Sequence, residues 1–89
     1  MANIQPIHNY FQGLRNDVMD RAPQAQDAYI ASMTKNPVYG IRNKTLYDAD
    51  GTVVALTKDM VAALRQAALR GLPALQNLIF VEWGITHYS

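Results

Sequence analysis

The chain has 89 residues, the length of one small domain. It contains no cysteine, so disulfides, thiolate catalysis and cysteine-ligated metal sites are excluded, and a reducing compartment is favoured. Eight Lys and Arg against seven Asp and Glu leave a formal net charge of +1, too small for the broad positive field of non-specific nucleic-acid binders.

The composition is rich in apolar side chains and poor in charge. Hydrophobic residues make up 49% of the chain and charged residues only 17%, so few charges are available to cover a monomer's surface. We therefore expect some apolar surface to meet a partner chain. The first nine residues lack the pattern of a signal peptide, and apolar runs such as Leu78 to Val81 are far too short to span a bilayer. These features predict a cytoplasmic protein with no membrane segment.

A helix with one buried face is predicted first. Pro6 suits the first helical position, and Ala22 is biased away from helical dihedrals by Pro23, so the helix is expected to end near Arg21. Its apolar stripe has steps of three and four residues and consists of Ile7, Tyr10, Phe11, Leu14 and Val18.

A second, shorter helix is predicted to open at Pro23 and to run to Lys35. Its thinner apolar face is centred on Tyr29, Ile30 and Met33. The pair Asn36-Pro37 stops this helix, because a residue before proline is pushed toward an extended conformation.

Between residues 38 and 56, β-branched and aromatic residues replace the helical period. We predict a two-stranded antiparallel hairpin over residues 45–56. Its turn is the segment Asp48-Ala49-Asp50-Gly51, because glycine tolerates a positive φ and the two Asp side chains can accept backbone N–H bonds. The pattern leaves open whether Val38 to Arg42 adds a third strand.

The best-defined helix is predicted to begin at the N-cap Thr57 and to end at Gly71. Asp59 complements the helix dipole, and Leu56 is placed to pack on Val61. Leu69 falls on the polar side of this helix. The row of small side chains at positions 63, 67 and 71 allows another helix to approach closely, and we expect that helix to belong to the same chain.

The C-terminal region is less determined. Pro73 can open a last helix ending near Gly84, but the run from Leu78 to Trp83 fits a buried strand equally well, because periodicity does not separate the two in so short a segment. Residues 85–89 are expected to form a tail.

Few residues gather in patterns that bind metals. Asp48 and Asp50 stand two apart before Gly51, as in the middle of an EF-hand calcium loop, but that register lacks the first oxygen ligand and the final glutamate. The histidines, His8 and His87, lie at opposite ends of the sequence without zinc-ligand spacing. We therefore expect no metal and no cofactor.

Catalysis is not supported by the pattern either. Ser32 and Ser89 lack the glycine-framed elbow of a nucleophilic serine. Glu82, beside Trp83 in an apolar run, is the one acidic residue expected to be partly buried, and pairing with an arginine or pointing to the rim is favoured over a catalytic role. Because no set of titratable groups converges, we expect a protein that is not an enzyme.

These elements predict one α+β domain over residues 1–89, with N-terminal helices, a β-hairpin, and one or two C-terminal helices packed on it. The order helix, hairpin, helix over residues 27–71 is loosely similar to that of small phage head-completion proteins, a likeness of element order that no diagnostic residue carries. It places a phage or viral origin among the hypotheses.

The first functional hypothesis is a non-enzymatic protein–protein interaction or assembly protein, with self-association included. Low charge, high apolar content, an unprotected hairpin edge and the apolar C-terminal segment motivate it. The expected interface residues are Leu69, Leu72, Phe80 and Trp83.

The alternative is a small nucleic-acid-binding or regulatory protein. It would use a modest basic patch with Tyr39 and Tyr47 as stacking residues. The basic residues of this patch are Arg42, Lys44, Lys58, Arg65 and Arg70.

Overall fold

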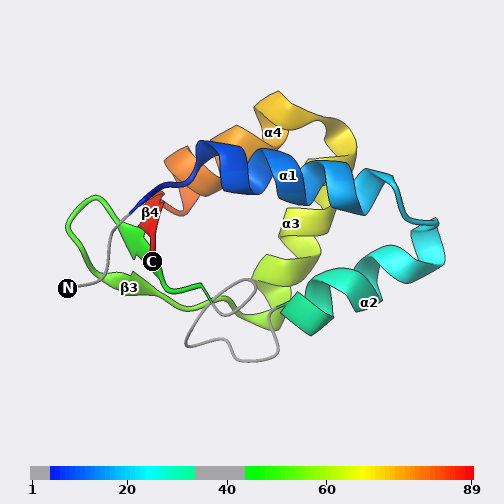
Figure 1. Ribbon diagram of the computed structural model, residues 1–89, viewed down its shortest axis with the longest axis horizontal. Coiled ribbons are helices and arrows are strands. Elements are labelled where there is room, and N and C mark those ends of the chain that lie inside the picture. The colour runs from blue at the N-terminus through cyan, green and yellow to red at the C-terminus, as the bar shows by residue number, and fades with distance from the viewer. Residues whose placement is uncertain (1–4, 34–43) are drawn as a thin grey trace.

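The computed structural model describes residues 5–33 and 44–89. It confirms the predicted α+β domain: short strands form an antiparallel sheet, and helices pack beside it. In chain order the elements are β1 (Gln5–Pro6), α1 (His8–Met19), α2 (Pro23–Met33), β2 (Leu46–Asp48), β3 (Val53–Val54), α3 (Lys58–Arg70), α4 (Leu72–Gln76), the π-helical turn η2 (Asn77–Glu82) and β4 (Ile85–Tyr88). Figure 1 shows the strands at one end of the molecule, α2 at the other end, and α3 between them.

The sheet has the order β1-β4-β2-β3, and every neighbouring pair is antiparallel. The prediction that residues 85–89 form a tail is therefore wrong, because β4 pairs with both β1 and β2 in the interior of the sheet. Ile85 is fully buried, and Ser89 exchanges two main-chain hydrogen bonds with Thr45, of 3.1 and 2.9 Å. A strand of four residues gains its stability from partners distant in sequence, which local pattern does not reveal.

The predicted hairpin is confirmed. Leu46 lies opposite Val54, and Tyr47 lies opposite Val53. Of the two turn aspartates, Asp48 supplies the side-chain bonds: its Oδ1 accepts from the main-chain N–H groups of residues 50 and 52, both at 2.9 Å. Gly51 has a φ of 82°, the positive value that the turn requires.

The first helix begins later than predicted. Pro6 pairs with His87 in the edge strand β1, where a residue without an N–H group is tolerated, so α1 starts at His8 and ends at Met19. The second helix begins at Pro23 as predicted, with Ile30 fully buried and Tyr29 partly buried. The side chain of Met33, the stop at 36–37 and the open third strand over residues 38–42 lie outside the described residues.

Helix α3 confirms the prediction at both ends. The Oγ1 of Thr57 accepts a hydrogen bond from the main-chain N–H of Met60 at 3.3 Å, which satisfies one of the free donors of the first turn. Gly71 ends the helix with φ 129° and ψ 167°, a backbone conformation that is essentially restricted to glycine. Leu64, Ala67 and Ala68 of this helix are buried.

The segment after Gly71 is helical, which answers the open choice between helix and strand for residues 73–84. Helix α4 begins at Leu72, so Pro73 is its second residue rather than its first. The chain then widens into η2, where the N–H of Trp83 donates to the carbonyl of Leu78, five residues back, at 3.0 Å. Such π-helical turns are rare and occur often at functional sites.

The core lies between α1, α3 and α4 and continues through η2 to strand β4. Its buried apolar residues are Ile7, Phe11, Leu14, Val18, Ile30, Leu46, Leu56, Leu64, Ala67, Ala68, Leu75, Leu78, Ile79 and Ile85. Every helix and the strands β2 and β4 contribute to it, so the described parts of the chain share one hydrophobic centre. Within the described ranges, no helix combines the length and apolarity needed to cross a bilayer.

Candidate interaction groove

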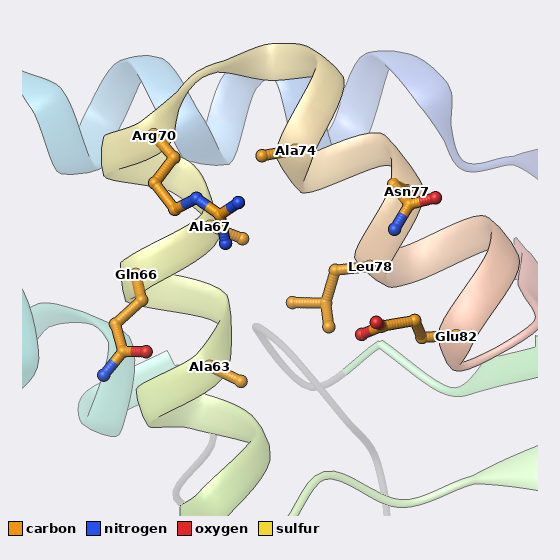
Figure 2. A pocket seen from close by; sticks show the side chains of 8 residues that line it. All are labelled: Ala63, Gln66, Ala67, Arg70, Ala74, Asn77, Leu78 and Glu82. Atoms are coloured by element: carbon orange, nitrogen blue, oxygen red, sulfur yellow. The ribbon is translucent and has the colours of Figure 1, made fainter.

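A groove with a volume of about 280 Å³ runs between α3 and the segment formed by α4 and η2 (Figure 2). We call it the α3–η2 groove. Residues from both sides line it: Ala63, Gln66, Ala67 and Arg70 from α3, and Ala74, Asn77, Leu78 and Glu82 from α4 and η2. Its size is just below that of pockets that hold drug-sized molecules.

The apolar lining of the groove is made of short side chains. Ala63 and Ala67 are four residues apart and so lie on one face of α3, and Ala74 faces them from α4. Helix α3 packs against a helix of the same chain, α4, as predicted, but at Ala63 and Ala67 the approach is incomplete and a groove remains. Alanines leave space between the two helices, and Leu78 fills only the middle of it (Figure 2).

Four polar side chains form the rim: Gln66, Arg70, Asn77 and Glu82. On α3, the spacing of four residues between positions 66 and 70 puts both side chains beside the groove. On η2, Asn77 and Glu82 are five residues apart, the hydrogen-bonding interval of a π-helix, so both reach the same groove. All four side chains are solvent-exposed or nearly so.

The groove carries one positive and one negative charge. The Arg70 guanidinium and the Glu82 carboxylate lie on opposite sides of the line from Gln66 to Asn77 (Figure 2). Within residues 5–33 and 44–89, neither charge has a hydrogen bond or an ion pair with another residue. Both charges are therefore available to a partner.

The expectation that Glu82 is partly buried is wrong, because the structure exposes it at the rim of the groove. Sequence pattern placed it inside an apolar run. In the π-helical turn, Leu78 and Ile79 take the inward positions, and the wider turn carries Glu82 outward.

The four predicted interface residues occupy different environments. Leu69 is 40% exposed on α3. Leu72, Phe80 and Trp83 are partly buried and pack against the protein's own core, and the ring of Phe80 lies 4.5 Å from that of His8 between centroids. Each of these three therefore has only part of its surface available for contact with another chain.

Sequence reasoning missed Val81, the most exposed of the large hydrophobic side chains described, with 73% of its surface accessible. In an α-helix, positions 78 and 81 would share a face, so Val81 would be expected to follow Leu78 toward the core. The π-helical turn breaks that register and leaves Val81 in solvent. No pattern in the neighbouring residues predicts this π-helical turn.

The basic residues of the alternative hypothesis have separate surroundings. The Lys44 ammonium lies 5.1 Å from the ring centroid of Tyr88, and Arg65 forms an ion pair with Asp27 on α2. Lys58 is the first residue of α3 and Arg70 the last, so the axial rise of the helix separates their backbones by about 18 Å. The structure thus does not bring these two together.

The remaining predicted residues of the basic patch add little to it. Arg42 and Tyr39 lie outside the described residues. The hydroxyl of Tyr47 is 3.3 Å from that of Ser89, in the sheet. Among the residues described, no three His, Asp or Glu side chains form a group that could hold a metal ion.

No protein-family model matches the chain, and no curated protein and no solved structure is significantly similar to it. Its function is therefore inferred from the surface of the fold itself.

Proposed function

We propose that the chain is a non-enzymatic protein–protein interaction or assembly protein whose contact surface is the C-terminal helical segment, residues 72–83. The observation that carries this proposal is the exposure of Val81, 73% accessible in the middle of η2. Burying a valine side chain stabilises a complex by about 1.5 to 3 kcal/mol, so its exposure favours contact with another chain.

A single exposed apolar side chain is ordinary on a protein surface. Val81 carries more weight because of its neighbours: Phe80 and Trp83, on the same turn, are buried only in part. Partly buried aromatic residues next to an exposed aliphatic one are typical of interface cores, where tryptophan and phenylalanine are enriched.

The low charge of the chain supports the same proposal. Charged residues make up 17% of the sequence, against about a quarter in a typical soluble domain. The two charges beside the α3–η2 groove, on Arg70 and Glu82, have no partner within the described residues and can fix the orientation of an incoming chain.

The proposal is tested by measuring the mass in solution by light scattering, together with a pull-down on the immobilised chain. We expect the wild-type chain to associate with itself or with a recovered partner, and Val81→Asp to lose that association. Val53→Asp is the matched control, because Val53 is also exposed, at 49%, but lies on β3.

Two results would contradict the proposal. A chain that stays monomeric at high micromolar concentration and recovers no partner would contradict the proposed interaction function. Association that Val81→Asp leaves unchanged would remove residues 72–83 as the contact surface.

A further inference from the structure

We infer that the α3–η2 groove receives a second copy of this chain, related by a two-fold axis, with Arg70 of each copy paired with Glu82 of the other. This inference rests on the proposed function and names the partner and the contact. It follows from the charges of the groove, from the position of its amides, and from its small apolar floor.

The charges of Arg70 and Glu82 define what a partner must offer to the groove. A partner that fits this groove must offer an anion to Arg70 and a cation to Glu82, because neither has an ion-pair partner in the described part of the chain. The chain itself presents both groups on one surface. In a two-fold contact, residue i of one copy meets residue j of the other and j meets i, so one Arg–Glu arrangement produces two ion pairs.

The amides of Gln66 and Asn77 flank the two charges. Figure 2 shows Arg70 and Glu82 on opposite sides of the line from Gln66 to Asn77, and a two-fold axis that passes between the two charges, perpendicular to the line joining them, brings each over the opposite charge of the second copy. Residues near such an axis approach their own symmetry mates. Side-chain amides carry both donors and acceptors and can pair with themselves, whereas two arginines or two glutamates would repel each other.

The floor of the groove permits close approach. The alanines of the floor are too small to keep the two copies apart: Ala63, Ala67 and Ala74. Leu78 lies in the middle of the floor, where it would contact Leu78 of the second copy. Ion pairs excluded from water between two such surfaces are stronger than exposed ones. A stable dimer buries at least about 1,000 Å², so we expect the contact to extend beyond the groove to Val81, next to Glu82.

The test is a charge exchange followed by sedimentation equilibrium. The wild-type chain is expected to dimerise as its concentration rises. Arg70→Glu alone, and Glu82→Arg alone, place like charges opposite each other and should weaken the dimer by at least about tenfold. The double variant restores opposite charges with their positions exchanged, and its dimer should return to within about threefold of the wild type.

The controls separate charge from position and from folding. Lys58→Glu and Asp20→Arg make the same charge changes at exposed positions outside the groove, and their dimers should match the wild type. Circular dichroism verifies that each variant is folded. Arg70→Gln and Glu82→Gln remove one charge without creating repulsion, so they provide a second, milder loss of dimerisation if a reversed charge disturbs the helix.

The outcomes distinguish this inference from the proposed function. If the wild type dimerises but the single reversals have no effect, or the double variant does not recover, the groove contact is overturned and another surface mediates association. If the wild type is monomeric but recovers a different protein in the pull-down, the second copy is overturned while the interaction function stands. If the wild type neither dimerises nor recovers a partner, both the groove dimer and the proposed interaction function are contradicted.

Discussion

The side-chain amide of Gln26 donates a hydrogen bond of 3.1 Å to the main-chain carbonyl of Val18, and this bond ties α2 to the last turn of α1. The same amide lies 3.2 Å from the carbonyl of Arg21, which it also reaches as a donor. The Val18 carbonyl also accepts the main-chain N–H of Arg21 at 3.1 Å, so the side chain of Gln26, 5% exposed, adds a second donor to it and pairs its own buried amide.

We expect Gln26→Ala to lower the free energy of unfolding by about 0.5 to 1.5 kcal/mol, because the hydrogen bonds of its side-chain amide to the end of α1 are lost. Urea denaturation followed by circular dichroism measures the change. Gln24→Ala is the control, since Gln24 is exposed on the same helix and should change stability little. Equal effects of the two substitutions would show that the hydrogen bonds of Gln26 do not stabilise the contact between α1 and α2.

Thr57→Ala should cost about 1 kcal/mol of stability, because the N-cap hydroxyl that accepts from Met60 is lost. Thr57→Ser keeps that hydroxyl and should retain most of the stability. The comparison can be made by thermal denaturation. A serine variant as unstable as the alanine variant would indicate that the methyl group, rather than the cap, matters.

Two glycines should respond in opposite directions to alanine. Gly13 lies within α1 with open space where a Cβ would be, so Gly13→Ala should raise the free energy of unfolding by about 0.5 to 1 kcal/mol. Gly71 has a φ of 129°, so Gly71→Ala should lower it by about 1 to 3 kcal/mol. Parallel urea titrations of the two variants test both signs. A stabilising Gly71→Ala would argue against this ending of α3.

The sequence predicted features that depend on near neighbours. The ends of α3 at Thr57 and Gly71 and the turn at Asp48 to Gly51 each follow from a few adjacent residues, and all three are confirmed. Features that depend on distant residues were missed. Strand β4 forms because Ile85 and its neighbours pair with strands near both ends of the chain.

The candidate site shows the same division. The small face of α3 at Ala63 and Ala67 was visible in the sequence, because helical spacing alone defines it. The exposure of Val81 and Glu82 was not visible. Both depend on the π-helical turn η2, which occurs in a run whose pattern fits a strand or an α-helix equally well.

Strand β4 should be essential to the fold. Ile85 is fully buried, so Ile85→Ala should lower the free energy of unfolding by about 2 to 5 kcal/mol, and removal of residues 85–89 should abolish cooperative unfolding. Thermal unfolding monitored by circular dichroism tests both variants. Thr86→Ala, at the next and only partly buried position, is the control and should have a smaller effect. A truncated chain that still unfolds cooperatively would contradict the position of β4 inside the sheet.

The most direct test of the account is the mass of the wild-type chain in solution, measured by light scattering over a wide range of concentrations. The opposite charges of Arg70 and Glu82 beside the groove and the exposed Val81 predict a mean mass that rises with concentration toward that of two chains, and less steeply at high salt. A mean mass that stays at that of a single chain up to the highest concentration would contradict the second copy in the α3–η2 groove.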